Sequence, residues 1–173
     1  MRILFISLPD LKKVYPQRPH QLIKRISNRH EVTILSVNAW WLEEKHDPFI
    51  YDCLKESRII YLSKKRVRTI FQELSSIKTR LLRKLDLSEF DVFVSFNDLI
   101  TSYFLSKKTK VSLILDISDD IPKYIRDSSE IPFLLGPIGE VISKFILYEN
   151  VKLSKKITYT QKSLIESYSI PRD

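Results

Sequence analysis

The sequence predicts a doubly wound α/β fold, in which a mainly parallel sheet lies between two layers of helices. Apolar segments rich in β-branched residues alternate with segments whose apolar residues recur at helical spacing. The strand segments are almost continuously apolar, as expected of parallel strands covered on both faces. Of the 173 residues, 43% are hydrophobic and 29% are charged, so the chain can build one core. We therefore expect a single domain over residues 1–173.

The first half of the chain contains three predicted strands. A mostly apolar strand over 2–8 is followed by an irregular stretch over 9–18. A helix then begins near Pro19, because a residue without an N–H suits the first helical turn. β-branched residues predict a second strand over 31–37, and a third strand is predicted over 58–62.

The second half continues the same alternation with three more strands. After Pro137, apolar residues recur at helical spacing from Ile138 to Ile146 and predict a helix. The remaining elements are predicted as strands over 91–96, 111–116 and 156–160, and as helices over about 98–107 and 161–169.

The residues needed for several common sites are missing. Gly136 and Gly139 are the only glycines, so the chain has neither a Walker loop nor a G-x-G-x-x-G turn. Cys53 is the single cysteine, and the three histidines show no metal-ligand spacing with it. No segment approaches the roughly 18 apolar residues of a membrane span, and the first residues lack a signal-peptide pattern. We therefore expect a cytoplasmic protein with no metal and no tightly bound cofactor.

Positive charge is concentrated in two segments. The formal net charge is +8, while residues 1–29 carry +6 and residues 64–84 carry +7. Apolar residues from Ile70 to Leu85 follow a helical stripe, which predicts a basic amphipathic helix. Such a helix either lies on an anionic membrane surface, at the inner face of the cell membrane, or covers the sheet with its basic residues solvated. The basic residues of this expected surface are Lys64, Lys65, Arg66, Arg68, Lys78, Arg80, Arg83 and Lys84.

Candidate binding residues stand where an open α/β sheet binds ligands, at the carboxyl ends of its strands. Arg18 and His20 lie at the start of the first helix. Backbone N–H groups favour an anion there, and a guanidinium can clamp a phosphate or a carboxylate. The alternative is a surface arginine and a histidine held by the helix cap.

Acidic residues crowd the end of the fifth predicted strand. Asp116, Asp119 and Asp120 are costly to place together unless a ligand, water or backbone N–H groups accept their charge. Carboxylates can bind sugar hydroxyls or hold a base for proton transfer, whereas a metal site needs more ligands than this segment offers. The alternative is a helix cap with two solvated neighbours. Ser118 lies among them, and Asn97 either joins this site or caps the next helix.

Four short pieces of sequence occur in an informative order. They are Q-R-P-H-Q-L at 17–22, H-E-V-T at 30–33, D-I-S-D at 116–119 and T-Q-K-S-L at 160–164. Together they resemble the amino-terminal half of a GT-B glycosyltransferase, closest to the retaining family that includes mannosyl- and glucosyltransferases and glycogen synthase. The chain departs from that pattern in its first loop, which lacks glycine, and at Ser118, where many relatives have histidine.

The resemblance implies a Rossmann-like domain that binds a glycan or lipid-linked acceptor. In the family, a carboxyl-terminal domain holds the nucleotide-diphosphate sugar donor, so this chain is expected to be half of a catalyst, inactive without that domain or a separate subunit. Arg18 would face an anionic group, and Asp116 and Asp119 would orient hydroxyls, while catalytic residues stay unassigned. The alternative is a basic peripheral-membrane or nucleic-acid-binding module without catalysis. Nucleic acid is disfavoured, because aromatic residues do not interleave with the basic cluster.

Overall fold

The computed structural model describes residues 1–14, 18–38, 54, 57–63, 67, 70–81, 85–129 and 131–168. The strands are β1 (Arg2–Ser7), β2 (Glu31–Ser36), β3 (Arg58–Tyr61), β4 (Val92–Phe96), β5 (Ser112–Ile117) and β6 (Ser154–Tyr159). The α-helices are α1 (Arg18–Ser27), α3 (Ile70–Ser76), α5 (Ile100–Lys108), α6 (Ile121–Asp127), α7 (Gly136–Leu153) and α8 (Lys162–Ser167). A π-helix, η1 (Ile77–Leu81), continues α3, and a 3₁₀ turn, η2 (Leu87–Glu89), precedes β4.

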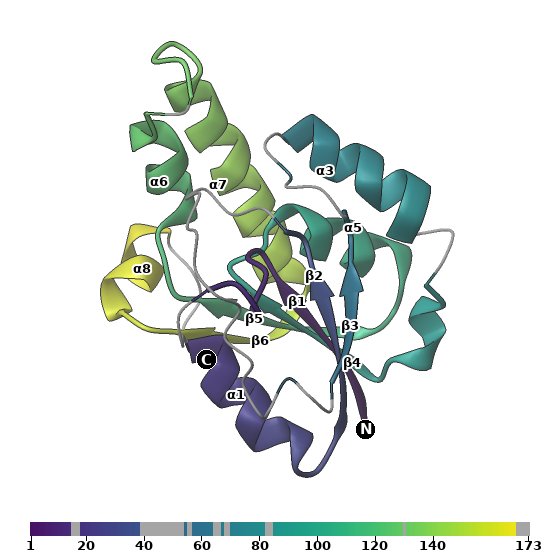
Figure 1. Cartoon of the computed structure of the whole chain (residues 1–173). Coiled ribbons are helices and arrows are strands. Elements are labelled where there is room, and N and C mark those ends of the chain that lie inside the picture. Colours follow the sequence, from purple (N-terminus) through teal and green to yellow (C-terminus); the bar gives the residue numbers. More distant parts are fainter. Residues whose placement is uncertain are drawn as a thin grey trace.

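Within the described residues, six strands form one sheet in the order β3-β2-β1-β4-β5-β6, and every neighbouring pair is parallel. Helices cover both faces, with α1 on one side and α3, α5 and α7 on the other (Figure 1). The predicted three-layer α/β fold is therefore confirmed. This strand order is typical of Rossmann-like folds, and it places the switch point, where ligands bind in such sheets, between β1 and β4.

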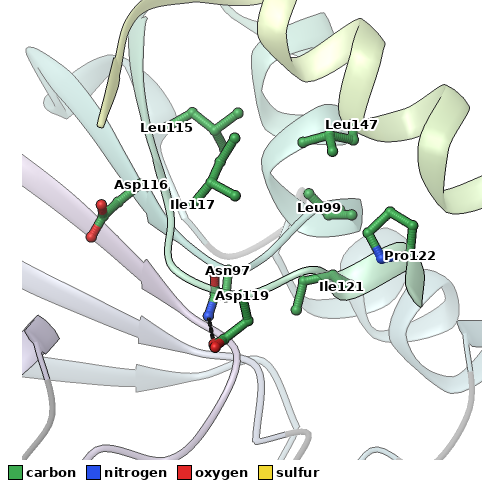
Figure 2. A pocket seen from close by; sticks show the side chains of 9 residues that line it. All are labelled: Asn97, Leu99, Leu115, Asp116, Ile117, Asp119, Ile121, Pro122 and Leu147. Carbon is green, nitrogen blue, oxygen red and sulfur yellow. Dashed lines mark hydrogen bonds between the residues drawn. The ribbon is translucent and has the colours of Figure 1, made fainter. Parts of the chain in front are cut away.

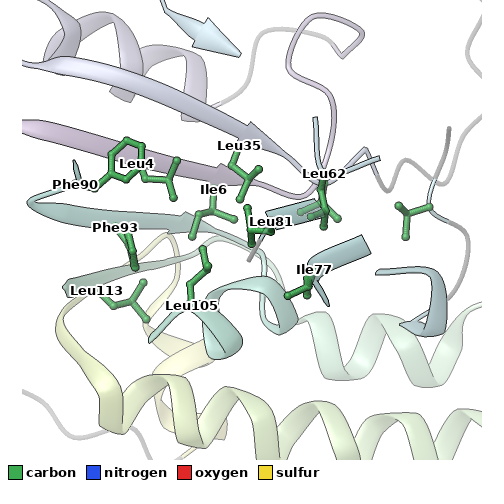
Figure 3. Close-up of a cluster of buried hydrophobic side chains, with 12 residues drawn as sticks. Leu4, Ile6, Leu35, Leu62, Ile77, Leu81, Phe90, Phe93, Leu105 and Leu113 are labelled. Atoms are coloured by element: carbon green, nitrogen blue, oxygen red, sulfur yellow. The ribbon is translucent and has the colours of Figure 1, made fainter. Parts of the chain in front are cut away.

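The core consists of two apolar layers, one on each face of the sheet. Because successive strand residues point to opposite faces, Leu4 and Ile6 pack toward α5 while Ile3 and Phe5 pack toward α1. Figure 3 shows the first of these layers, in which all twelve side chains are buried. Its members are Leu4, Ile6, Leu35, Val37, Leu62, Val67, Ile77, Leu81, Phe90, Phe93, Leu105 and Leu113.

The structure has one helix that the sequence pattern does not predict. α6 begins directly after the acidic strand end, and the Asp120 carboxylate caps it by accepting from the Lys123 N–H at 3.0 Å. The Tyr168 hydroxyl donates to the same carboxylate. Pro122 occupies the first turn, where a missing N–H costs nothing. Asp120 therefore has the helix-cap role that was the alternative to a binding role.

The helix predicted after Pro137 forms, but the stripe that predicted it faces outward. Val141 is 67% exposed and Phe145 is 61% exposed, whereas Ser143 and Asn150 are buried. The Asn150 amide donates to the Leu99 carbonyl at 2.7 Å, so this inward polar side chain is held by the loop after β4. α7 therefore packs with a mixed face, on which Leu147 and Val151 join the core beside Ser143 and Asn150, and exposes most of the predicted stripe.

The basic amphipathic helix is described only in part. Ile77 and Leu81 are buried against the sheet, so the described stripe covers the sheet, as one of the two interpretations expected. Lys78 is exposed, and the side chain of Arg80 is not described. Lys64, Lys65, Arg66, Arg68, Arg83 and Lys84 lie outside the described residues. In the part of the chain that the structure describes, no helix has the length and apolarity to cross a bilayer.

Candidate functional site

The candidate site lies at the carboxyl-terminal edge of the sheet, where β4, β5 and β6 end beside the start of α1. Parallel strands all end at the same edge, so residues distant in sequence meet there. Arg18 and Asp116 are separated by 98 positions, yet the Arg18 Nε donates to the Asp116 Oδ2 at 3.0 Å. Most of the residues predicted from the sequence meet at this edge.

Asp116 holds Arg18 in place. Its side chain is 1% exposed, and its second oxygen, Oδ1, accepts from the Thr158 hydroxyl at 2.7 Å. Both carboxylate oxygens therefore have partners within the protein, and a buried carboxylate is stabilised by such pairing. The Arg18 side chain remains 38% exposed. Asp116 thus acts as a positioning residue, and the guanidinium is the group that a ligand can reach.

Asn97 joins the loops after β4 and β5. Its backbone has φ of 51°, a left-handed conformation that asparagine tolerates better than most residues. Its side-chain Nδ2 donates to the Ser118 Oγ at 2.6 Å and to the Asp119 Oδ2 at 2.5 Å, and its Oδ1 accepts from the Ser118 N–H at 2.9 Å. Asn97 is buried and Asp119 is exposed, so the amide presents the carboxylate to solvent.

A shallow hollow opens beside Asn97 and Asp119 (Figure 2). Polar atoms of Asn97 and Asp119 lie on one side of it, and aliphatic side chains such as Leu115 and Leu147 lie on the other. Its free volume is only about 10 Å³, room for about one water molecule and far below the roughly 300–1,000 Å³ typical of drug-sized ligand pockets. A ligand larger than water would therefore contact the polar rim without being enclosed by the hollow. The hollow is lined by Asn97, Leu99, Leu115, Asp116, Ile117, Asp119, Ile121, Pro122 and Leu147.

His20 has a different environment from the one its position in the sequence suggested. It is buried, and its Nε2 lies 2.9 Å from the Leu11 carbonyl oxygen. This contact ties the start of α1 to the loop after β1. Because the ring is buried, a ligand arriving from solvent would first meet Arg18.

The same loop carries a second acidic group. Asp10 is buried, its Oδ1 accepts from the Lys12 N–H at 3.1 Å and the Tyr61 hydroxyl at 3.4 Å, and the Lys13 Nζ lies 3.3 Å from its Oδ2. Burial, reinforced by the Asp10 charge, raises the pKa of Tyr61 to about 12. Tyr61 therefore stays protonated at neutral pH and donates to Asp10.

A buried pair of acids behind the site was missed by sequence reasoning. Glu73 of α3 accepts from the Thr101 hydroxyl at 2.7 Å, and Asp98 accepts from the Ser102 N–H at 3.0 Å. Burial, and then the neighbouring Asp98 charge, raises the pKa of Glu73 to about 8, while burial raises the pKa of Asp98 to about 6. The available signal was that Glu73 is the single acidic residue between positions 64 and 84.

Within the described ranges, no three His, Cys, Asp or Glu side chains converge as metal ligands would. A scan against models of known protein families gives no match to this chain, and a search of curated proteins gives none either.

Proposed function

We propose that this domain binds the acceptor in a nucleotide-sugar-dependent glycosyltransferase. The acceptor is a glycan or a lipid-linked sugar, and a second domain or subunit holds the nucleotide-diphosphate sugar from which the hexosyl group is transferred. The four ordered sequence pieces support this proposal, and so does the Rossmann-like sheet. The observation that carries it is that one edge of the sheet holds two oriented polar groups, Arg18 fixed by Asp116 and Asp119 fixed by Asn97, of which Asp119 lines the hollow.

Each exposed group of the cluster has a chemical use in this proposal. The Arg18 guanidinium, oriented by Asp116, supplies a fixed cation for a phosphate or carboxylate. Asp119, oriented by Asn97, accepts hydrogen bonds from sugar hydroxyls. Groups that are already oriented lose little conformational freedom when they bind, so they can hold an acceptor hydroxyl in a defined position for attack.

Acceptor binding can be tested on the 173-residue chain by screening glycans and sugar phosphates, followed by NMR titration of each ligand found. Arg18→Gln and Asp119→Asn should each weaken binding about tenfold or more, because each removes a charge-assisted hydrogen bond. Two variants are the matched controls. Arg25→Gln changes another arginine of α1, and Glu89→Gln changes an acidic residue just before β4 begins, at the opposite edge of the sheet from the site. Failure of every carbohydrate to bind would overturn the proposal, as would unchanged affinity in both site variants.

The division of labour has its own test. We expect the isolated chain to transfer no sugar from any nucleotide sugar, since the donor site belongs to another domain or subunit. Transfer by the purified chain, measured by release of the nucleoside diphosphate in the presence of an acceptor, would contradict the half-enzyme interpretation. It would leave the assignment of the acceptor site standing.

A further inference from the structure

The strongest unexplained feature is an apolar hairpin formed by α6, the turn at 131–135 and α7. Phe133 is 90% exposed and Leu134 is 80% exposed. The hairpin projects from the body of the domain, with its turn at the far end (Figure 1). Its exposed large apolar side chains are Tyr124, Phe133, Leu134, Leu135, Ile138, Val141, Ile142, Phe145 and Tyr148.

The hairpin is closely packed, so its orientation is built into the fold. A Cβ at Gly136 would lie 2.7 Å from the Arg126 carbonyl oxygen, and a Cβ at Gly139 would lie 2.7 Å from the Ile125 Cγ2. These are the only two glycines in the chain, and both occur where α7 approaches α6. An ion pair of 3.5 Å between Arg126 and Glu140 also joins the two helices. The exposed apolar face is therefore held outward by close helix packing.

Polarity changes along the hairpin from tip to base. From Ile131 to Gly139, no side chain has a hydrogen-bonding group. Near the base of α7, Tyr148 and Lys152 are exposed, and the Lys152 ammonium lies 4.1 Å from the centre of the Tyr148 ring. Tyrosine and lysine combine an apolar body with a polar end, which suits the boundary between lipid and water. This gradient is the one expected of a segment that enters a bilayer with its tip first.

The exposed area is large for a free surface. With about 150–250 Å² for each aromatic side chain, the patch amounts to on the order of 1,000 Å², above the 300–600 Å² usual for the largest patch on a monomer. A protein–protein interface of this area ordinarily contains about ten hydrogen bonds, and the tip of the hairpin offers no side chain that could form them. A helix packed along α7 would also leave the projecting tip uncovered. A lipid surface would cover both the tip and the helix face.

Charge within the hairpin is largely neutralised internally. Lys144 pairs with Glu140 at 2.7 Å, and Lys152 pairs with Glu149 at 3.3 Å. Insertion would therefore depend on apolar area and little on the charge of the lipid headgroups. This separates the hairpin from the basic segment at 64–84, whose membrane interaction would require anionic lipid.

We propose that the tip of this hairpin and the outward face of α7 insert into the interfacial layer of a phospholipid bilayer. The domain then sits on the membrane without crossing it. The inference rests on the hairpin alone and is independent of the proposed sugar chemistry.

Vesicle co-sedimentation tests the proposal. The full chain should pellet with vesicles of phosphatidylcholine alone, and nearly as well when phosphatidylglycerol is added or when salt is raised. The double variant Phe133→Ser, Leu134→Ser should lower the partition coefficient at least tenfold on both vesicle types. Both side chains are exposed, so the thermal unfolding midpoint should be unchanged. Tyr159→Ser, which alters an exposed aromatic residue on β6, is the control and should bind as the parent does.

Four results would overturn the proposal. The parent chain could fail to pellet with phosphatidylcholine, or the double variant could pellet equally well. Binding only in the presence of anionic lipid would assign the interaction to the basic segment. A dimer in analytical ultracentrifugation that the double variant abolishes, together with no vesicle binding, would instead make the hairpin a protein interface.

Discussion

Replacing Glu73 by glutamine should make the free energy of unfolding of this domain depend much less on pH. Glu73 is buried beside the charge of Asp98, and burial is the main reason that its pKa rises from 4.5 to about 8. In the unfolded chain, the same carboxyl is solvated and titrates near its ordinary value. The folded state therefore holds a proton on Glu73 over a pH range in which the unfolded state has lost it.

The sign of the effect follows from this difference in proton binding. Where the folded state binds more protons, stability falls as pH rises. The loss of stability attributable to Glu73 begins above about pH 4.5 and is complete above about pH 8. At about 1.4 kcal/mol for each tenfold change in proton affinity, the ceiling is on the order of 5 kcal/mol. Asp98 adds a loss of the same sign below about pH 6, so the interval from pH 6 to pH 9 isolates Glu73.

Urea unfolding of both chains from pH 5 to pH 9 measures this difference. The Glu73→Gln chain can still accept from the Thr101 hydroxyl, so it should resemble the parent at pH 5 and exceed its free energy of unfolding by a few kcal/mol at pH 9. Glu89→Gln replaces an exposed carboxyl and should follow the parent throughout. Equal slopes for the parent and Glu73→Gln between pH 6 and pH 9 would refute the reasoning.

Two further predictions concern backbone positions. Gly136→Ala should lower the free energy of unfolding by about 1–3 kcal/mol and by more than Gly139→Ala does, because the new methyl group meets the Arg126 carbonyl in one case and the movable end of the Ile125 side chain in the other. Thermal and urea unfolding measure both, and a larger loss in Gly139→Ala would contradict the packing argument. Asn97→Ala should destabilise the chain more than Asn97→Gly, because both lose the side-chain bonds but glycine alone accepts a φ of 51° without strain. Equal stability of those two variants would mean that the left-handed backbone is not a constraint.

Much of the fold was predictable because its strands are locally encoded. The run at 31–37 is rich in β-branched and apolar residues, and it is buried from Val32 onward because helices or loops cover both faces of a parallel strand. α6 was missed because it is only seven residues long and its cap, Asp120, also fitted an acidic binding loop. Short helices depend on their caps and on packing more than on a periodic pattern.

The candidate site was predictable in position more than in detail. Sheet topology sends every strand end to one edge, so Arg18, Asp116 and Asp119 could be selected together. Their roles depended on partners that sequence spacing does not reveal. Asp116 is occupied by Arg18 and Thr158, and Asn97 orients Asp119 as well as joining two loops.

The sequence by itself determined the alternation of strands and helices, the parallel sheet and the edge at which polar residues gather, because these follow from local hydrophobic pattern and chain direction. Only the tertiary structure decided which face of α7 packs inward. Apolar residues at helical spacing share one face of a helix. Which face of the helix is buried depends on the residues of the neighbouring elements that pack against it. Here the Leu99 carbonyl accepts a hydrogen bond from the buried Asn150 amide, and two glycines let α6 approach closely. The apolar face is thereby turned to the outside, where we infer that lipid covers it.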